Sequence, residues 1–231
     1  MGRGKAVSLL TLYHGSEKII SMPEPFGGSP FRDFGAGFYV TESREAAGQW
    51  ACSIGSGGFI NSYKLETDGL KILDLSGPDQ SILNWLALVM SSRKYRVSDP
   101  LFARALDYLI SNFLPDTQGY DMIRGNRADE IYFFFAKAFM KNQISLRQFR
   151  LLMNLGPLGE QLVIRSDKAF ERLSFDSLKG ADSVYSYPKK KIRNSGAMAN
   201  FIAEIDIGDE GGLFMEDIFR EEIKPDDGRL R

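Results

Sequence analysis

The only histidine in this chain of 231 residues is His14. It follows a run of apolar and β-branched residues over 7–13 and precedes Gly15 and Ser16, a pattern typical of the end of a strand. An imidazole at such a place can hydrogen-bond a ligand or exchange a proton with it. Considered alone, this stretch is more often that of a structural or solvated histidine.

A second stretch that could do chemistry reads Asp33-Phe34-Gly35-Ala36-Gly37-Phe38-Tyr39-Val40-Thr41. Its glycines let the backbone turn tightly or approach a ligand, because glycine tolerates positive φ. We expect 38–40 to form a short strand and Thr41 to cap the helix that follows. Taken alone, Phe38 and Tyr39 fit a hydrophobic core better than a binding site.

The single cysteine, Cys52, rules out a disulfide within the chain, as expected of a protein in a reducing compartment. As a catalytic nucleophile it would need a base, and His14 is the only histidine in the sequence. A buried and unreactive thiol is the commoner fate of a lone cysteine. We favour that interpretation.

Composition argues against several classes of partner. Lys plus Arg total 29 against 30 for Asp plus Glu, a formal net charge of −1, so nothing global attracts nucleic acid or an anionic membrane. The basic run 189–193 is expected to be a solvated loop. Residues 1–5 lack the features of a signal peptide, and the longest apolar run, 85–90, is too short to cross a bilayer. We therefore expect a cytoplasmic protein with no membrane span.

Apolar periodicity and turn signals predict an α+β fold. Strands are expected over 7–14, 38–40, 59–66, 70–75, 120–124 and 161–165, with 59–66 and 70–75 joined into a hairpin at Asp68-Gly69. Helices are expected from Thr41 to about 55, over 81–91, from Asp99-Pro100 to 113, over 128–140 and over 145–154. Segment 168–175 is expected to be a short helix or turn before a last strand, and 210–231 a flexible tail.

Four motifs occur in order along the chain: His-Gly-Ser at 14–16, the aromatic and glycine stretch at 33–41, Ala-Ala-x-x-Trp-Ala at 46–51, and a late strand that begins Glu-Gln-Leu-Val at 160. In this combination the chain resembles the ADP-ribosyltransferase fold, and most closely a DUF3990-like group of small bacterial proteins of uncharacterised function. The resemblance covers residues 9–175. It implies one domain over 1–231 with a split β-sheet core and a helical block inserted at about 78–155. A Rossmann fingerprint and a phosphate-binding loop are both absent from the sequence.

The resemblance implies that NAD⁺ is the substrate and that its nicotinamide–ribose bond is broken through a cationic transition state. His14 would hydrogen-bond a ribose hydroxyl, the backbone of Gly15 would hold the nicotinamide amide, and Tyr39 would stack on the nicotinamide ring. The remaining residues that the resemblance assigns to NAD⁺ binding are Ser16, Asp33, Gly37, Phe38 and Thr41. No metal is implied.

The third catalytic position departs from the usual glutamate, because Gln161 stands there. Glutamine can hydrogen-bond a ribose hydroxyl but brings no negative charge. The adjacent Glu160 should point to the opposite face of its strand. Asp129 and Glu130 also resemble a recurring element of the bacterial group and could serve as a base or bind the target, although acids at a helix start often only stabilise the helix.

Two functional interpretations follow. The favoured one is a mono-ADP-ribosyltransferase or NAD⁺ glycohydrolase that acts on a protein or nucleic-acid target, which suits a toxin or effector delivered into a host or competitor cell. The alternative is a catalytically inactive nucleotide- or partner-binding module on the same fold, which Gln161 favours. A nucleic-acid modifier related to RNA 2′-phosphotransferases fits poorly, because those enzymes use further histidines.

Overall fold

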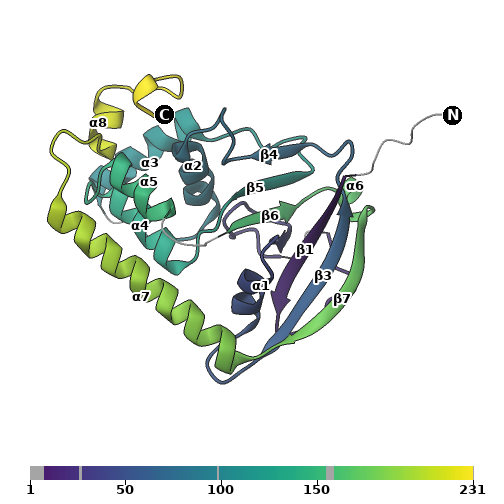
Figure 1. Cartoon of the computed structure of the whole chain (residues 1–231). Coiled ribbons are helices and arrows are strands. Elements are labelled where there is room, and N and C mark those ends of the chain that lie inside the picture. The colour runs from purple at the N-terminus through teal and green to yellow at the C-terminus, as the bar shows by residue number, and fades with distance from the viewer. Residues whose placement is uncertain (1–7, 26–27, 98, 155–158, 231) are drawn as a thin grey trace.

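The computed structural model of the chain describes residues 8–25, 28–97, 99–154 and 159–230. Within these ranges the fold is mixed α+β, with two sheets and eight α-helices. The strands lie together on one side of the molecule and most helices on the other (Figure 1). The strands are β1 Leu9–Ser16, β2 Phe38–Val40, β3 Gly58–Glu66, β4 Ile72–Asp74, β5 Met122–Asn126, β6 Glu160–Ile164 and β7 Leu173–Ala181. The helices are α1 Arg44–Ala51, α2 Ile82–Ser92, α3 Pro100–Phe113, α4 Glu130–Met140, α5 Leu146–Asn154, α6 Asp167–Phe170, α7 Ser183–Ile207 and α8 Met215–Arg220.

The strands form two sheets that meet at one point. The first has the order β1-β3-β7 and is antiparallel, and the second has the order β2-β6-β5-β4 with only β4 and β5 parallel. An isolated bridge joins them, in which the Tyr13 amide donates to the Thr41 carbonyl at 2.8 Å and the Thr41 amide to the Tyr13 carbonyl at 2.9 Å. Beyond this bridge β1 diverges from the second sheet.

Helix α1 covers the point where the sheets diverge, and Gly15 explains how closely it packs. A Cβ on Gly15 would lie 1.8 Å from the carbonyl oxygen of Ala47, so only glycine fits against this helix. The helix begins two residues later than the sequence predicts. Ser43 caps it by accepting from the Ala46 amide, while the Thr41 hydroxyl donates to the Glu160 carbonyl at 2.9 Å. The prediction that Thr41 caps the helix is therefore wrong, because its hydroxyl links β2 to β6.

The predicted hairpin of 59–66 with 70–75 is also wrong. The turn at Asp68-Gly69 exists, with the Leu70 amide donating to the Thr67 carbonyl at 3.0 Å. However, β3 pairs with β1 and β7, whereas β4 pairs with β5 in the other sheet. Turn chemistry is local, whereas strand partners are decided by which apolar faces can be buried together.

Helices α2 to α5 form the helical block, and their predicted positions are confirmed to within about two residues. Strand β5 interrupts the block, since it follows α3 and lies between β4 and β6. The indole of Trp85 donates to the Asn126 carbonyl at 2.8 Å, and the rings of Phe139 and Phe149 stack at 5.2 Å. The block is thus continuous with the sheet through a shared apolar core. The predicted break after α5, at 155–159, lies almost wholly outside the described residues.

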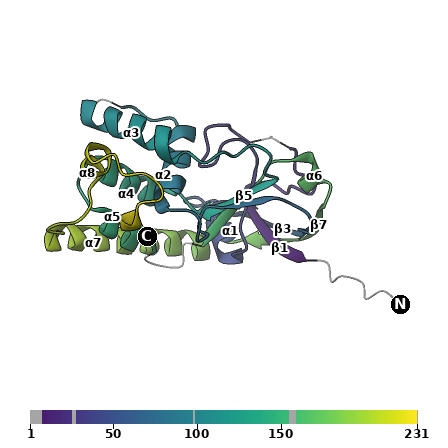
Figure 2. The same ribbon diagram turned by 90° about the horizontal axis from the view of Figure 1, so that it is seen from above.

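The C-terminal quarter departs most from expectation. The basic run 189–193 lies within α7, a helix of 25 residues, and is not a loop. Residues 210–230 are not frayed, because Met215, Ile218, Ile223 and Leu230 are buried against the helical block. Pro188 and the scattered apolar residues of α7 hide the one-sided pattern by which an amphipathic helix is recognised. Figure 2 shows α7 along one edge of the molecule with α8 beside the helical block.

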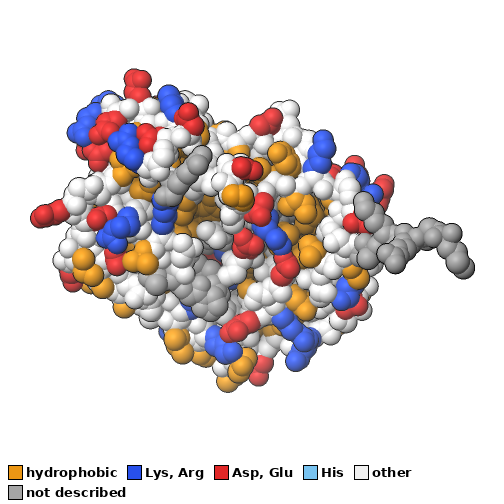
Figure 3. Space-filling view, turned by 45° about the horizontal axis from the view of Figure 1, so that its top comes forward, with side chains coloured by type: hydrophobic (Ala, Val, Ile, Leu, Met, Phe, Trp, Pro, Cys, Tyr) orange, Lys and Arg blue, Asp and Glu red, His pale blue; other side chains and the backbone are white. Residues whose placement is uncertain are grey.

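Surface charge is mixed in sign. On the face shown in Figure 3, blue and red side chains are interspersed, in keeping with a net charge of −1. No helix in the described ranges is long and apolar enough to span a bilayer.

Burial of the C-terminal segment predicts that Ile218→Ala lowers the free energy of unfolding by about 2–4 kcal/mol, because a buried aliphatic side chain is lost and a cavity remains. The matched control is Ile54→Ala, whose side chain is 79% exposed and should change stability by less than about 0.5 kcal/mol. Urea unfolding measures both. Equal, negligible effects would show that the segment does not pack on the block.

Candidate functional site

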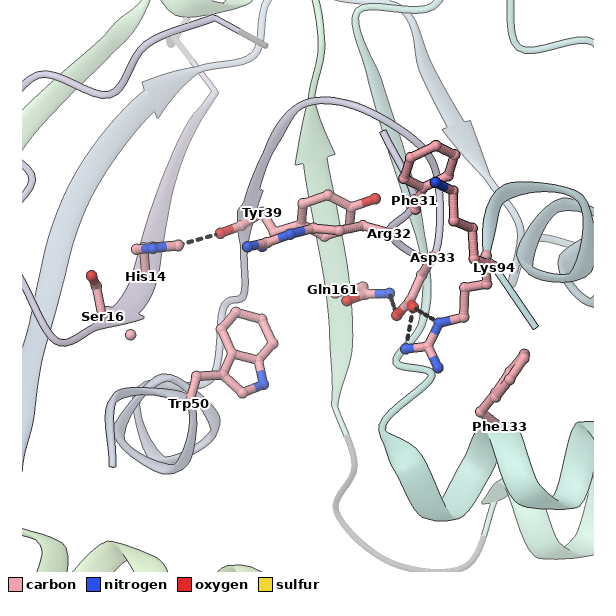
Figure 4. A pocket seen from close by; sticks show the side chains of 12 residues that line it. His14, Ser16, Phe31, Arg32, Asp33, Tyr39, Trp50, Lys94, Phe133 and Gln161 are labelled. Atoms are coloured by element: carbon pink, nitrogen blue, oxygen red, sulfur yellow. Dashed lines mark hydrogen bonds and ion pairs between the residues drawn. The ribbon is translucent and has the colours of Figure 1, made fainter. Parts of the chain in front are cut away.

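A cavity of about 640 Å³ opens where the two sheets diverge. Six of the residues that the sequence analysis selected line it: His14, Gly15, Ser16, Asp33, Tyr39 and Gln161. They come from β1, β2, β6 and the segment before β2, so the fold brings together residues that are far apart in the chain. Figure 4 shows His14 and Tyr39 on one side of this cavity and Gln161 with Asp33 on the other.

His14 is held in a defined state by the backbone of β2. Its Nδ1 lies 2.6 Å from the Tyr39 carbonyl oxygen, and because a carbonyl only accepts, Nδ1 carries the proton. Burial lowers the pKa of His14 below its ordinary value, and the nearby positive charge of Arg32 lowers it further, against the opposing effect of the Tyr39 carbonyl. Near neutral pH the ring is therefore uncharged, and Nε2 is a hydrogen-bond acceptor.

The position of His14 in the strand differs slightly from expectation. β1 continues through Gly15 and Ser16, so His14 lies inside the strand and not at its end; residue 7 lies outside the described ranges. Since main-chain groups of alternate residues point to the same edge of a strand, those of Gly15 point the same way as those of Tyr13, which bond Thr41. The amide and carbonyl of Gly15 thus face the side on which the sheets separate.

Tyr39 is a supporting residue as well as a lining residue. Its hydroxyl donates to the Gly35 carbonyl at 2.7 Å and accepts from the Phe34 amide at 2.9 Å. Burial raises the pKa of Tyr39 well above its ordinary value, so the hydroxyl keeps its proton. The guanidinium of Arg32 lies 5.4 Å from the ring centroid. A ligand ring that stacks on Tyr39 must share the ring with Arg32 or displace it.

Asp33 is the centre of the polar network. Its Oδ1 accepts from Nε of Arg93 at 2.6 Å, and its Oδ2 accepts from the Ala128 amide at 3.1 Å and from Nε2 of Gln161 at 2.7 Å. The residue is only 7% exposed. A buried carboxylate requires such partners, because an unpaired charge in the interior is very costly.

Gln161 therefore has a partner that the sequence could not reveal. Its amide donates to Asp33, and its neighbour Glu160 points to the other face of β6, where it lies 3.5 Å from Arg124. The predicted opposition of Glu160 and Gln161 is confirmed. Glu160 does not line the cavity.

Five other candidates are also placed outside this cavity. Gly37 and Phe38 line a neighbouring hollow of about 550 Å³ that shares His14 and Tyr39 with it. A Cβ on Gly37 would lie 2.4 Å from Val163, and Phe38 lies 4.7 Å from the His14 ring, so both have packing roles. The third of these residues, Thr41, joins the two sheets, as described above.

Asp129 and Glu130 begin α4, away from the cavity. Asp129 accepts from Arg127 at 2.8 and 2.9 Å and from Arg193 at 2.6 Å, while Glu130 is exposed in the first turn. Neither lines the cavity. Asp129 thus fixes α7 to the start of α4. A role for this pair as a base or in binding a target stays a prediction.

The sequence analysis missed half of the lining. The six residues not selected are Phe31, Arg32, Trp50, Arg93, Lys94 and Phe133. Arg93 lies over the ring of Phe133 at 4.6 Å, and the ammonium of Lys94 over the ring of Phe31 at 3.6 Å. Trp50 had been noted within its motif, but nothing in the sequence around Arg93 and Lys94 predicted that Arg93 would bond Asp33 or that Lys94 would line the same cavity.

The charge of the lining suits an anionic ligand. Three cationic side chains, Arg32, Arg93 and Lys94, face one acidic side chain, Asp33. Arg93 is committed to Asp33 by an ion pair of 2.6 Å. Arg32 and Lys94 contact aromatic rings and, among the described residues, form no ion pair. They are the cations best placed to meet a ligand.

Cys52 takes no part in this site. It is buried, and its thiol donates to the Ala181 carbonyl at 3.5 Å. The predicted burial is confirmed. Among the described residues no group of three or more His, Cys, Asp or Glu side chains is placed to hold a metal ion.

The contact between Gln161 and Asp33 predicts the effect of Gln161→Glu on stability. A second carboxylate would replace an amide that lies 2.7 Å from Asp33. We expect the free energy of unfolding to fall by roughly 3 kcal/mol near neutral pH, as for a broken buried pair. The loss should shrink as the pH is lowered toward about 4, because a protonated carboxyl can donate to Asp33.

The matched control is Glu160→Gln, the neighbouring position on the opposite face, whose ion pair is partly exposed and worth less than about 1 kcal/mol. Urea unfolding across a pH series compares the two variants. Equal effects, or a Gln161→Glu deficit that does not depend on pH, would contradict the proposed pairing.

Comparison with known proteins identifies the family. The sequence model of a family described as a protein of unknown function (DUF3990) matches residues 10–175. Neither the curated proteins nor the solved structures contain a match to the chain. The matched region includes all residues that line the cavity. The chain therefore belongs to the DUF3990 family.

Proposed function

We propose that this protein binds NAD⁺ in the cavity between its sheets and breaks the nicotinamide–ribose bond, passing ADP-ribose to a protein or nucleic-acid target or to water. The observation that carries the proposal is the state of His14, an uncharged imidazole fixed through Nδ1 to the Tyr39 carbonyl. With Nδ1 engaged, Nε2 is left to accept a hydrogen bond from a ribose hydroxyl. Such a bond would fix the sugar whose C1′–N bond breaks.

The fold supports the proposal. Support comes from two sheets that share one bridge, with a histidine on β1 and an aromatic residue on β2, because the ADP-ribosyltransferase resemblance implies a split sheet with these residue types. The main chain of Gly15 faces the opening and can bond the carboxamide of nicotinamide. Trp50 and Tyr39 line the same cavity and offer aromatic surfaces to the ligand rings.

The cationic side chains that line the cavity can bind the pyrophosphate of NAD⁺. Arg32 precedes Asp33 in the chain and Lys94 follows α2, and the side chain of each contacts an aromatic ring and pairs with no acid among the described residues. A guanidinium can bind a phosphate with two hydrogen bonds, and an ammonium binds it as a point charge. The diphosphate would therefore lie along the Arg32 and Lys94 side of the cavity.

Bond breaking leaves positive charge on the ribose, and among the described residues Asp33 is the only acid that lines the cavity. Its carboxylate already bonds Arg93 and Gln161. We assign Gln161 and Asp33 to positioning the ribose and assign most of the rate enhancement to the orientation of NAD⁺. An enzyme of this kind needs cellular NAD⁺, so we place its action in the cytoplasm of the producing cell or of a cell that receives it.

A second candidate function is an inactive nucleotide- or partner-binding module on the same fold. The engagement of both Asp33 oxygens favours it, because no uncommitted carboxylate among the described residues lines the cavity. The two candidates differ in one respect. Both bind NAD⁺, but only the enzyme releases nicotinamide.

Purified protein incubated with NAD⁺ is expected to release nicotinamide, and His14→Ala should reduce the rate roughly 100-fold, because the ribose is no longer fixed. Binding, measured by calorimetry, should weaken only about three- to tenfold, since one hydrogen bond is lost. Binding without release would favour the inactive module. Release that survives in His14→Ala would remove His14 from the site, and the absence of both binding and release would refute the proposal.

Tyr39 is tested with phenylalanine and not with alanine. The residue is only 5% exposed, so removal of its ring would leave a cavity in the core. Tyr39→Phe keeps the ring and the carbonyl that holds His14, but removes the hydroxyl that bonds Phe34 and Gly35. We expect a stability loss of about 1–2 kcal/mol with nicotinamide release retained within about tenfold. A complete loss of release would instead assign chemistry to the hydroxyl. Tyr63→Phe, which removes another buried hydroxyl bonded to a carbonyl outside the cavity, is the control.

The lowered pKa of His14 predicts the pH dependence of binding. The ring of His14 in the folded protein becomes half protonated only below pH 6.5, its ordinary pKa. Affinity for NAD⁺ should therefore be constant above about pH 6.5 and fall as the pH drops through the lowered pKa, because protonated Nε2 can no longer accept. Calorimetric titration over pH 5–8 tests this, with His14→Ala as the control whose affinity should lack the decline. An affinity that rises on acidification would contradict the neutral acceptor.

A further inference from the structure

Helix α7 is long, but it buries little of itself. Only Ala197 and Phe201 are buried among its 25 residues, and it runs along the outer edge of the molecule (Figure 1). Its exposed apolar side chains are Val184, Tyr185, Ile192, Ile202, Ile205 and Ile207. Ile192 is 73% exposed and Ile202 is 54% exposed. Apolar surface that follows a helix in this way marks an interaction site.

The outer residues of α7 recur at alternating intervals of three and four. We define the outer seam of α7 as the following residues: Tyr185, Pro188, Ile192, Ser195, Ala199, Ile202 and Asp206. This spacing is that of the contact positions in paired helices. The inward residues Ala197 and Phe201 fall between seam positions, so the seam lies on the side that faces away from the core. Its small central residues, Ser195 and Ala199, would allow a second helix to approach closely.

Charge on this surface is divided between the two ends of the helix. Lys191 lies near the start of the outer seam, and Asp206 forms its last position. Both are exposed, and neither has an ion-pair partner among the described residues. Lys189 and Arg193 point to the other side, where they bond Glu45 and Gln49 of α1.

We propose that the outer seam of α7 pairs with the same seam of a second copy of this chain, antiparallel and about a two-fold axis near residue 197. In this register Ile192 of each copy lies opposite Ile202 of the other, and Ser195 lies opposite Ala199. Lys191 of each copy lies beside Asp206 of the other. A parallel pair would instead place like charges together, and this self-complementarity is why a second copy fits better than an unrelated partner.

The pairing leaves the cavity open. The contacts of α7 with α1 and α4 come from Lys189, Arg193 and Phe201, on sides of the helix other than the outer seam. None of the seam residues lines the cavity. Dimerisation is therefore separable from NAD⁺ binding, and the proposal stands or falls independently of the proposed function.

The test is sedimentation equilibrium of the full chain over a range of concentrations. The wild type is expected to form a dimer, and Ile192→Glu combined with Ile202→Glu a monomer. Lys191→Glu and Asp206→Lys should each weaken dimerisation roughly 3- to 30-fold, because the two-fold axis makes each substitution disrupt two Lys191–Asp206 contacts in the dimer. The two together should restore it. Lys190→Glu makes the same charge change away from the seam and should leave dimerisation unchanged within about twofold.

Disulfide trapping fixes the orientation. Ile192→Cys alone should form no disulfide between the two copies. In the proposed dimer, residue 192 of one copy lies ten residues along the helix from residue 192 of the other, about 15 Å. A mixture of Ile192→Cys with Ile202→Cys should give a covalent heterodimer. Circular dichroism verifies that the exposed substitutions leave the fold intact. A monomeric wild type, a dimer that persists in the double glutamate variant, or self-cross-linking of Ile192→Cys would overturn the proposal.

Discussion

The buried carboxylate of Asp33 is the interaction on which the site depends. It accepts hydrogen bonds from Arg93 after α2, from the Ala128 amide before α4 and from Gln161 on β6. A charge removed from water must be compensated by such contacts. One side chain therefore fixes the segment before β2 against the helical block and the second sheet, and it determines where Arg32, Phe31 and Tyr39 can lie.

The other side of the cavity is set by the junction of the sheets. The bridge between Tyr13 and Thr41 brings β2 beside β1, and Tyr39, two residues before Thr41, then offers its carbonyl to His14. Gly15 lets α1 approach β1 closely, and this close packing places Trp50 of α1 in the lining of the cavity. The imidazole state is thus a consequence of backbone geometry, and it is maintained without a carboxylate partner for the histidine among the described residues.

The sequence predicted much of this site but not how it is held. His14, Tyr39, Asp33 and Gln161 were selected because the motifs that contain them resemble those of a known family in type and order. Arg93 could not, because its role depends on where the end of α2 meets Asp33, sixty residues earlier in the chain. The same reason explains the wrong hairpin, since the partner of β3 is β7, more than a hundred residues later. Helix α7 was missed because it exposes apolar residues on its outer side, so its pattern does not reveal a buried face.

His14 is the only histidine in the chain, so NMR of isotope-labelled imidazole nitrogens would report on this one ring without ambiguity. Titrated with and without NAD⁺, the ring should be neutral near pH 7 with the proton on Nδ1, and its pKa should lie below about 6.5. NAD⁺ should shift the Nε2 resonance and lower the pKa further, because the bound form requires the neutral ring. A charged ring near pH 7, a proton on Nε2, or imidazole nitrogen resonances that do not shift at saturating NAD⁺ would contradict the assignment of His14 as the acceptor for the ribose.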